Sequence, residues 1–565
     1  MTVFAGIISL SNEKISSERK SIITRVFQQS CLHQNIFEIS TDSSLFLSFN
    51  ISEDEKGNIN ESSNSIATIA GDPLFRTEGD DRYNEIKSIN SAEGITGLKS
   101  LLKKAKGVFS GVKLNNTSKS TFIFTDKLGI RPVYYYQYDD VLIYSSLMLF
   151  FENLPFVNLD TDFDGLCESL AFSFCLANRT PYENIKRLNG GEILFLNNNV
   201  VSVESYWDWQ NIPVKSELTN DDVEDAYKLF DNAVKLRLNQ GSEAIAFLSG
   251  GLDSRVICSQ VKAHVDTLHT FNFSTGRSQD NEFARVFAEN AGLVHHEKEF
   301  AKLAYPNWAQ LIADGIKDID HSLDKVTNRG TVWSGDGGSV AVGHVYINED
   351  INNALINGDL PTAVEKYLLS TKINLPTRFL KKEYVQKTHR LLENTVAKEF
   401  LINKNDPAKA IYYFLMNNDQ KRHLQVHFET ICQHKVELHL PFFDSEFLAT
   451  IYALPSHELL YHKFYMKWFK FFPSCAQTTP WQTYPKHEEC PLKTPEGLSY
   501  QWEVSAKKST NRRDDYDIYR QVKHARVFKQ YFDSKKVFIA MTLHRLGIKD
   551  FSYLVKYFNQ LNAIK

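Results

Sequence analysis

The stretch that decides the fold is Ala244-Ile245-Ala246-Phe247-Leu248, followed directly by Ser249-Gly250-Gly251-Leu252-Asp253-Ser254. The five apolar residues are typical of a short buried strand, and the residues after Ser254 have the pattern of a helix. A second strand candidate, Thr267–Phe273, comes after that helix. Strand, glycine-rich turn, helix and strand in this order predict a βαβ unit in a parallel sheet.

The glycine-rich turn has the composition of a phosphate-binding loop. Gly250 and Gly251 allow the backbone to approach a phosphate closely, and the exposed N–H groups at the start of a helix favour the anion. Asp253 would repel a phosphate, so its position implies a bridging Mg²⁺. The chain contains no GxxxxGK[ST] sequence, which argues against a loop that transfers a γ-phosphate. The alternative interpretation is a tight strand-to-helix turn without a ligand.

The overall composition is that of a globular protein. The chain has 565 residues, 42% hydrophobic and 23% charged, enough for about two to four domains. Its 64 Lys+Arg and 68 Asp+Glu nearly balance, so neither nucleic acid nor a membrane is expected as a partner. Seven cysteines without a CxxC pair predict neither a disulfide framework nor a zinc site. Without a signal-peptide pattern or a long apolar run, the expected location is the cytoplasm.

The pattern along the chain changes near residue 210. The first 200 residues are rich in short strand-like runs separated by turn formers, which predicts mainly antiparallel sheet with a few helices. Asn211–Thr219 is a plausible linker, Asp221–Leu238 has helical spacing, and the chain after about residue 350 is mostly helical in pattern. We therefore divide the chain into domains at 1–205 and 215–565.

The hexapeptide Ser249–Ser254 resembles the pyrophosphate-binding loop of asparagine synthetases and their relatives, which cleave ATP to AMP and pyrophosphate. Further stretches resemble motifs of the same family in the same order. They are Asp126–Tyr135 (a D-x-x-G-x-R-P-x-Y-Y hairpin), Gln279–Ala284 (an acidic turn), His295–Glu297 (a strand entry), Ser334–Gly338 (a second glycine-rich loop) and Glu437–Asp444 (an E-x-R-x-P-F-L-D helix signature).

This resemblance implies a fold and an activity. The expected fold is an N-terminal β-rich sandwich domain of the N-terminal-nucleophile (Ntn) glutaminase type, followed by a PP-loop ATP-pyrophosphatase α/β domain with a helical C-terminal part. Enzymes of the family activate a carboxylate as an acyl-adenylate, which an amine attacks to form an amide. The implied cofactors are ATP and Mg²⁺. The implied partners are a small-molecule or peptide carboxylate and an amine, and the resemblance leaves a homodimer open.

The resemblance also assigns residues. Asp336 is the match for a carboxylate that orients or deprotonates the amine, and Lys486 is the best positional match for a catalytic lysine. Asp336 could instead be a turn former, Lys463 or Lys467 could take the place of Lys486, and any of these lysines could be a surface residue without a role. Asp253 is the expected metal ligand. The residues expected to bind ATP or pyrophosphate are Leu248, Ser249, Gly250, Gly251, Leu252, Asp253, Ser254, Ser334 and Gly335.

Two departures from the family pattern bear on function. The family's glutaminase nucleophile is an N-terminal Cys, where this chain has Thr2, and the RGPD and NGEIYN stretches that hold glutamine are absent. The nearest counterpart of the latter is Ile69–Leu74. We expect an N-terminal domain that does not hydrolyse glutamine, although threonine is a nucleophile in other hydrolases. Ser339 stands where the family usually has an acidic residue, which predicts weaker Mg²⁺ binding.

Three functions remain open at this point. The first is an amidoligase in a biosynthetic or tailoring pathway, since relatives without the Cys include β-lactam synthetases and lasso-peptide macrolactam synthetases. The second is an asparagine synthetase that uses ammonia or glutamine. The third is a degenerate paralogue that binds nucleotide without catalysis.

Overall fold

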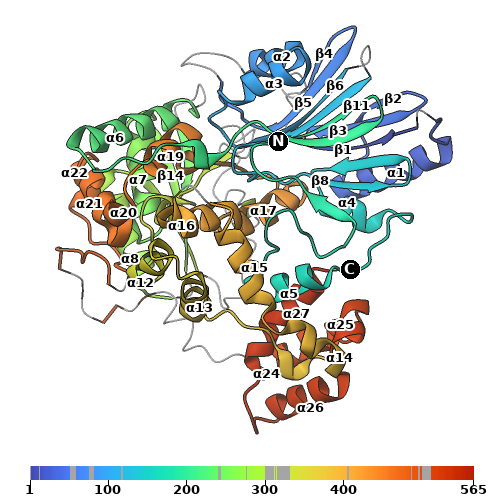
Figure 1. Ribbon diagram of the computed structural model, residues 1–565. Helices are drawn as coiled ribbons and strands as arrows, with labels where there is room; N and C mark the ends of the chain where they lie inside the picture. Colours follow the sequence, from blue (N-terminus) through green and yellow to red (C-terminus); the bar gives the residue numbers. More distant parts are fainter. Residues whose placement is uncertain are drawn as a thin grey trace.

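The computed structural model contains two six-stranded sheets, one five-stranded sheet and a helical C-terminal part (Figure 1). It describes residues 2–11, 13–50, 59–75, 82–115, 119–238, 243–274, 276–299, 331–403, 406–484 and 511–564. Shorter described pieces lie at 311, 313–314, 486–493, 495, 497–498 and 500. No helix among these residues combines the length and the apolar character that crossing a bilayer requires.

The N-terminal domain is an antiparallel sandwich, as predicted. Its first sheet has the order β10-β8-β9-β1-β3-β2 and its second the order β12-β11-β7-β6-β5-β4. Phe4 and Leu142 from the first sheet pack with Ile66 and Ile123 from the second, which buries the inner faces of both. The strands are β1 (Thr2–Ser9), β2 (Phe37–Ser40), β3 (Ser44–Asn50), β4 (Ile59–Glu61), β5 (Ser65–Gly71), β6 (Phe109–Asn115), β7 (Ser120–Thr125), β8 (Tyr134–Tyr138), β9 (Val141–Ser145), β10 (Ile185–Arg187), β11 (Glu192–Asn197) and β12 (Val200–Ser205).

Helices cover the outer faces of the sandwich. On the second sheet, Ile86 and Leu98 pack against Phe122 and Phe124 in a separate buried cluster. A two-residue turn at Asn198 and Asn199, both with positive φ, joins β11 to β12. The covering helices are α1 (Ser17–Cys31), α2 (Arg82–Ser91), α3 (Gly94–Leu102) and α4 (Met148–Asn153).

The third sheet is parallel, with the order β15-β14-β13-β16-β17. The predicted βαβ unit is present: β13, α7 and β14 follow one another, and β13 pairs with β14. Before them, α6 starts at Asn220 because Thr219 and Asp222 form a capping box. The elements are α6 (Asn220–Lys235), β13 (Glu243–Phe247), α7 (Leu252–Lys262), β14 (Thr267–Ser274), α8 (Gln279–Ala291), β15 (Val294–Glu299), β16 (Thr331–Trp333) and β17 (Glu437–His439).

The chain beyond residue 338 is mostly helical, as expected. One group of helices packs near the parallel sheet and a second group forms a separate lobe (Figure 1). The first group is α11 (Gly338–Ala341), α12 (Glu349–Ile356), α13 (Leu360–Ser370), α15 (Leu391–Phe400), α16 (Ala410–Phe414), α17 (Lys421–Glu429), α18 (Ile431–His434), α19 (Ser445–Tyr452), α20 (Ser456–Leu459), α21 (Lys463–Phe469) and α22 (Ser474–Gln477). The lobe contains α14 (Lys382–Val385), α24 (Arg512–Val522), α25 (Arg526–Tyr531), α26 (Ser534–Arg545) and α27 (Val555–Asn562).

Helix α5 (Phe163–Phe172) follows the N-terminal strands in sequence but lies against this C-terminal lobe (Figure 1). The Phe163 ring is 5.4 Å from the Tyr384 ring and 5.5 Å from the Tyr531 ring, measured between centroids. Arg526 donates to Asp160 at 2.8 Å just before α5. The sequence division at 205–215 therefore does not separate two independent bodies.

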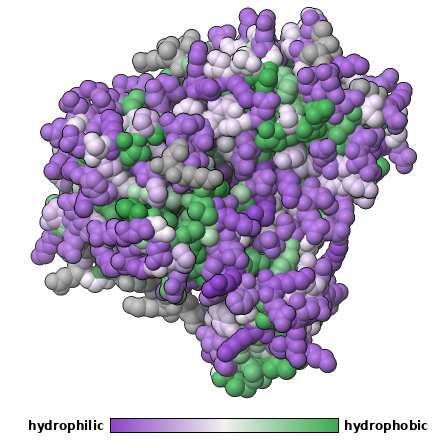
Figure 2. All heavy atoms as spheres, viewed as in Figure 1, coloured by the Kyte–Doolittle hydropathy of each residue, from purple (hydrophilic) through white to green (hydrophobic). Residues whose placement is uncertain are grey.

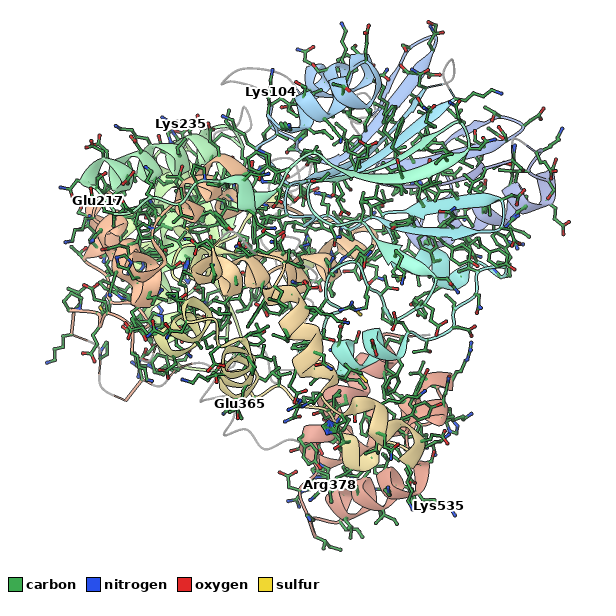
Figure 3. All side chains as sticks on the ribbon, in the orientation of Figure 1. Lys104, Glu217, Lys235, Glu365, Arg378 and Lys535 are labelled. Carbon is green, nitrogen blue, oxygen red and sulfur yellow. The ribbon has the colours of Figure 1, made fainter. Side chains whose placement is uncertain are left out.

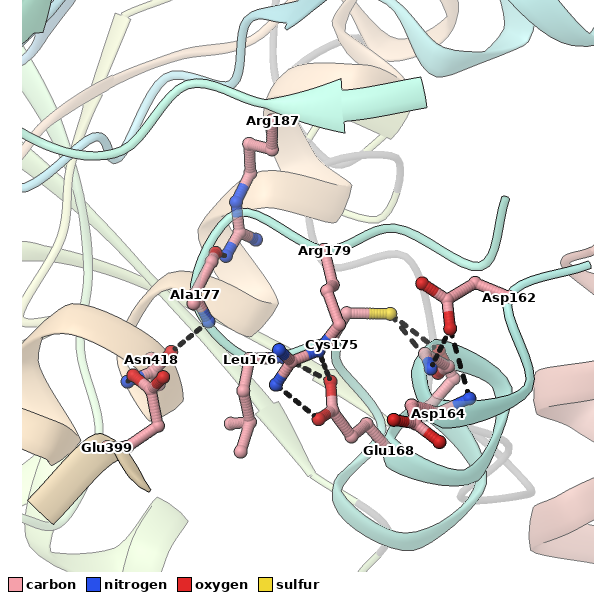
Figure 4. A network of polar contacts seen from close by, with 12 residues as sticks. Asp162, Asp164, Glu168, Cys175, Leu176, Ala177, Arg179, Arg187, Glu399 and Asn418 are labelled. Carbon is pink, nitrogen blue, oxygen red and sulfur yellow. Dashed lines mark hydrogen bonds and ion pairs between the residues drawn. The ribbon is translucent and has the colours of Figure 1, made fainter. Parts of the chain in front are cut away.

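A buried polar network joins α5 to the helices beside the parallel sheet (Figure 4). Glu168 of α5 is fully buried and pairs with Arg179, with 2.5 Å between Nη2 and Oε1. The Ala177 N–H donates to Oδ1 of Asn418 at 2.9 Å, and the Asn418 amide donates to Glu399 at 3.2 Å. The two sequence halves thus share an interior.

The expected helix over Glu437–Asp444 is wrong in its first part. Glu437 to His439 form strand β17, which pairs in parallel with β16, and Asp444 then caps α19 by accepting from the N–H groups of Glu446 and Phe447. Parallel pairing with β16 decides this conformation, and no local pattern predicts it.

Candidate nucleotide site

The glycine-rich loop Ser249–Gly251 is held in shape by serine hydroxyls. The Ser249 N–H donates to Oγ of Ser254 at 2.9 Å, and the Gly251 N–H donates to Oγ of Ser249 at 3.3 Å. Leu248, before the loop, donates its N–H to the Phe271 carbonyl at 2.9 Å. Helix α7 begins at Leu252 with Gly251 as its N-cap residue and without a side-chain cap. Its first-turn N–H groups are therefore left for another acceptor, such as an anion.

Asp280 supports this loop from the start of α8. Its Oδ1 accepts the Gly250 N–H at 3.1 Å, and its Oδ2 accepts from the Asn272 amide at 3.0 Å. The same amide donates to the Leu248 carbonyl at 2.9 Å. Burial raises the pKa of Asp280, against the effect of these donors. A Cβ on Gly250 would lie 2.7 Å from Cα of Asp280, so this contact requires glycine.

The second glycine-rich loop packs directly on the first. A Cβ on Gly335 would lie 2.6 Å from the Ser254 nitrogen, and a Cβ on Gly338 would lie 2.5 Å from Oδ1 of Asp253. Because β13 and β16 are adjacent in the sheet, the loops that follow them meet at the same edge. Ser334 and Gly335 are therefore brought next to Ser249–Ser254, as the resemblance implied.

Asp253 lies at the centre of this contact. Its Oδ1 accepts from the Tyr465 hydroxyl at 3.0 Å, and its Oδ2 accepts from the Ser339 hydroxyl. Burial raises the pKa of Asp253 to about 6; the two hydroxyl donors oppose this shift and the charge of Asp336 adds to it. Ser339, the departure from the family pattern, thus contacts the one residue expected to hold metal.

The first loop and Ser339, which directly follows the second loop, border a cavity of about 230 Å³. Its far wall is the segment Gln482–Tyr484, where the Gln482 N–H donates to the Gly250 carbonyl at 3.2 Å. Arg255, fully buried on α7, holds the preceding segment by donating to the carbonyls of Ala476, Thr479 and Pro480. The lining residues are Ser249, Gly251, Leu252, Asp253, Asp280, Ser339, His462, Gln482, Thr483 and Tyr484.

Sequence reasoning did not identify His462, Tyr465 or Tyr484 as site residues. His462 lies on the cavity wall with its ring centroid 4.7 Å from that of His487, and burial lowers its pKa to about 3. The aromatic-rich run around Lys463 was the available signal, but nothing local shows which of its side chains face the loops. A larger hollow, about 360 Å³, lies beside α1. Neither glycine-rich loop borders it, so we place the site at the loops.

The two residues expected to be catalytic do not line the cavity. Asp336 is exposed at its rim, where its Oδ2 accepts from the Ser334 hydroxyl at 2.7 Å. Lys486 is exposed, with φ of 69°, just beyond Tyr484. Lys467 is exposed and pairs with Glu458 at 3.0 Å. The roles of Asp336 and Lys486 stay predictions.

The residues beside the loops fit a divalent cation held mainly by nucleotide. Asp253 supplies a carboxylate, and Ser339 and Tyr465 supply only hydroxyls. Among the described residues, no group of three or more His, Cys, Asp or Glu is placed to hold a metal alone. Mg²⁺ accepts such sites, since it commonly takes one or two carboxylates together with phosphate and water oxygens.

Thr2 stands at the position of the family's glutaminase nucleophile, in the N-terminal domain. Thr2 is 1% exposed in β1, and within the described part of the chain its Oγ1 has no hydrogen-bond partner. At the end of β5, a Cβ on Gly71 would lie 2.3 Å from Nε of Arg131. Arg131 fills that space and forms an ion pair with Glu437 of the other half. The stretch nearest to the family's glutamine-holding sequence is thus packed against a domain contact.

Comparisons with known proteins agree with this geometry. The asparagine synthase family model matches residues 225–465, and the glutamine amidotransferase domain model matches residues 87–207. A putative asparagine synthetase 2 of Methanocaldococcus jannaschii is 24% identical over 36% of this chain and 41% of its own length. Asparagine synthetase 2 of Bacillus subtilis is 26% identical over 34% of this chain and 27% of its own length.

The alignments thus span less than half the length of these curated relatives. Among solved structures, a glutamine phosphoribosylpyrophosphate amidotransferase from B. subtilis aligns at 10% identity over 44% of this chain and 61% of that chain. Its TM-score is 0.25, too low to carry an argument. The two family models follow each other in the order of the two sequence halves, and both glycine-rich loops lie within the residues that the asparagine synthase model matches. Both halves of the chain thus match domains of the asparagine synthetase family.

Proposed function

We propose that this chain is an ATP-dependent amidoligase. It would transfer AMP to a carboxylate with release of pyrophosphate, and an amine would then displace AMP to form an amide. The observation that carries the proposal is the packing of the two glycine-rich loops against each other at Asp253, beside a cavity that Asp253 and Ser339 line. A phosphate loop without its partner loop would support only nucleotide binding.

The chain's own residues have distinct parts in this reaction. The first-turn N–H groups of α7 and the loop glycines would hold the leaving pyrophosphate. Asp253, with water and phosphate oxygens, would hold Mg²⁺, which when bound neutralises phosphate charge. Asp336 would orient the amine or accept its proton at the rim, and Lys486 would contact the substrate if its segment closes over the cavity. Gln482–Tyr484 would exclude water from the acyl-adenylate.

The amine would come from a source other than glutamine. Thr2 replaces the family's thiol and is 1% exposed, and the RGPD and NGEIYN stretches that hold glutamine in the family are absent. The proposed role is therefore biosynthetic or tailoring amide formation in the cytoplasm. The reaction itself requires neither nucleic acid nor a membrane.

A second candidate is asparagine synthesis from aspartate and ammonia. The curated relatives favour it, since they are named as asparagine synthetases. A cavity of about 230 Å³ is also small enough for a compact acyl substrate beside the phosphates. A catalytically silent paralogue is less favoured, because both loops retain their glycine contacts.

The deciding experiment measures AMP and pyrophosphate formation from ATP and Mg²⁺. Aspartate, other amino acids and short peptides are screened as carboxylates, with ammonium or glutamine as the amine source. We expect AMP and pyrophosphate in equal amounts with one carboxylate, and activity with ammonium but not with glutamine. Formation of ADP and phosphate, or nucleotide binding without turnover across the screen, would contradict the proposal.

A further inference from the structure

Positive charge is concentrated in the C-terminal lobe. Residues 511–564 contain eleven Lys and Arg, five Asp and no Glu, a difference of six positive charges. The whole chain, in contrast, has 64 basic and 68 acidic residues. The near balance that argues against an anionic partner for the whole chain therefore does not hold for this lobe.

Helix α26 is apolar on two opposite faces. Its inner face, with Val537, Ala540 and Met541, is buried in the lobe. Its outer face carries Phe538 and Ile539, which are 52% and 58% exposed. Leu546 and Ile548 continue this face beyond the end of the helix, each 67% exposed. Large apolar side chains gathered on an exposed face mark a contact surface, so the outer face has the character of one. We call these four exposed residues the α26 patch.

Basic side chains surround the α26 patch. At 100° per residue, Lys535 lies on the apolar face one turn before Phe538, and Lys536 and Arg545 lie on its flanks. Lys549 directly follows Ile548 beyond the end of the helix. Within the described residues, Lys535, Arg545 and Lys549 form no ion pair, and only Lys536 does, with Asp533 at 3.4 Å. Lys535 stands at the periphery of the lobe in Figure 3.

The nearby acids are already engaged in holding the lobe together. Asp533 caps α26 through the N–H groups of Lys535 and Lys536, and Asp550 contacts His544 and Ser552. Hydrogen bonds at Asp533 and Asp550 lower the pKa of each carboxyl. Neither acid neutralises the three unpaired cations around the patch.

We propose that the α26 patch docks on an anionic membrane surface. The four apolar side chains would enter the interface between headgroups and acyl chains, and the surrounding cations would contact lipid phosphates. Figure 2 shows apolar atoms gathered at the protruding far end of the lobe. A convex apolar tip with a cationic border fits a lipid surface.

A second copy of this chain fits the patch poorly. In a two-fold contact the patch would meet itself, so Lys535, Lys536, Arg545 and Lys549 of both copies would face one another without an intervening carboxylate. An acidic protein is the other partner of complementary charge, and the experiment below separates it from lipid.

The test is flotation of the full-length protein with vesicles of phosphatidylcholine alone or of three parts phosphatidylcholine to one part phosphatidylglycerol. We expect the protein to float only with the anionic vesicles, and flotation to weaken as salt is raised. Each cation near such a surface contributes about a fivefold factor in affinity. Replacing Lys535, Arg545 and Lys549 by Gln should therefore weaken binding roughly a hundredfold.

The apolar part is tested with Phe538→Ser combined with Ile539→Ser, which should lower binding at least about tenfold. Leu369→Ser on α13 is the matched control, since Leu369 is 68% exposed outside the lobe. All variants should keep the wild-type thermal midpoint, because the replaced side chains are exposed.

Three outcomes would overturn the proposal. They are equal flotation with both vesicle types, unchanged binding in the apolar variant, and a dimer of the wild-type protein that the apolar variant disrupts. Binding of an acidic protein through the patch, in the absence of anionic-vesicle binding, would likewise assign the surface to another occupant. None of these outcomes depends on catalysis, so the proposed ligase activity stands or falls separately.

Discussion

The two halves of the molecule retain different parts of the same family pattern. In the C-terminal half, glycines at 250, 335 and 338 allow two loops to pack within contact distance, and Asp253 lies between them. In the N-terminal half, the sandwich is complete, but a buried Thr2 stands where the family has its nucleophilic Cys. The two halves thus differ in which motif residues they retain, which is why function must be argued from the site and not from the fold.

The strongest test of the comparison is Asp253→Ala. Pyrophosphate formation should fall about a thousandfold, because a metal-assisted charge effect of several kcal/mol is lost. The fold should persist, since burial of Asp253 disfavours its charged form and its pKa is raised to about 6. The measurement is initial rate at saturating ATP, with the thermal midpoint as the folding control. Wild-type turnover in this variant would remove the metal role from Asp253.

The junction of the halves is tested by Arg131→Met. Removing one partner of the buried ion pair with Glu437 should cost about 3–5 kcal/mol of stability. Arg526→Gln, which breaks the exposed pair with Asp160, is the control and should cost less than about 1 kcal/mol. Urea unfolding compares the two. Equal, small losses would mean that the Arg131 contact does not hold the halves together.

Lowering the pH should distinguish the stability of the wild type from that of Arg131→Met. Burial raises the pKa of Glu437, but the charge and the hydrogen bond of Arg131, together with other nearby positive charge, outweigh it, so the net shift is downward. A lowered carboxyl pKa contributes stability that is present above the ordinary value and is lost as pH falls through the folded value. The wild type should therefore lose stability below about pH 4.5. In Arg131→Met that contribution should be missing, and an unchanged acid profile would count against the pair.

Asp336→Asn tests the rim of the cavity. Amide formation should fall at least about tenfold, the lower part of the range for a positioned acid or base. Nucleotide affinity should change little, because Asp336 is exposed outside the cavity wall. Product formation and ATP binding are measured on the same preparation. Loss of ATP binding with an unchanged rate at saturating ATP would move Asp336 to the nucleotide.

Ser339→Asp tests whether residue 339 lies beside the bound Mg²⁺. A second carboxylate facing Asp253 should lower the Mg²⁺ concentration needed for nucleotide binding several-fold, because ligand charge tunes affinity for such cations. Equilibrium binding of a non-hydrolysable ATP analogue across a Mg²⁺ series gives the readout, with Ser339→Ala as the matched control. If both variants show the same Mg²⁺ dependence as wild type, Ser339 is not near the bound cation.

The smallest expected effect is at Thr2. Neither the wild type nor Thr2→Cys should release ammonia from glutamine, because restoring the thiol leaves the glutamine-holding stretches absent and Arg131 beside Gly71. Glutaminase activity in Thr2→Cys would show that the site is intact apart from its nucleophile. Activity in the wild type that is lost in Thr2→Ala would contradict the expectation outright.

Local sequence predicted the elements whose signals are local. The strand expected at Ala244–Leu248 is observed at Glu243–Phe247, and the helix expected at Asp221–Leu238 is observed at Asn220–Lys235. The short apolar run and the helical spacing were visible without tertiary information. The three-residue strand at Glu437 was not, because its only reason is pairing with β16.

The sequence predicted those parts of the site whose residues are consecutive in the chain or follow neighbouring strands. Ser249–Ser254 forms one continuous turn, so its members had to lie together, and Gly335 met them through neighbouring strands. His462 reaches the cavity, and Tyr465 reaches Asp253, only through helix packing. Asp336 and Lys486 came from motif position alone, which gives a place in the sequence but no side-chain direction.

The position of α5 has a consequence for how the protein is made. Asp160 and Phe163 find Arg526 and Tyr531 only long after they themselves have been synthesised, since 366 positions separate Asp160 from Arg526. During translation the strands of the sandwich can pair early, while α5 must wait beside them without its partners in the lobe. Synthesis of residues 511–564, and not completion of the first domain, should therefore be the point at which this contact closes.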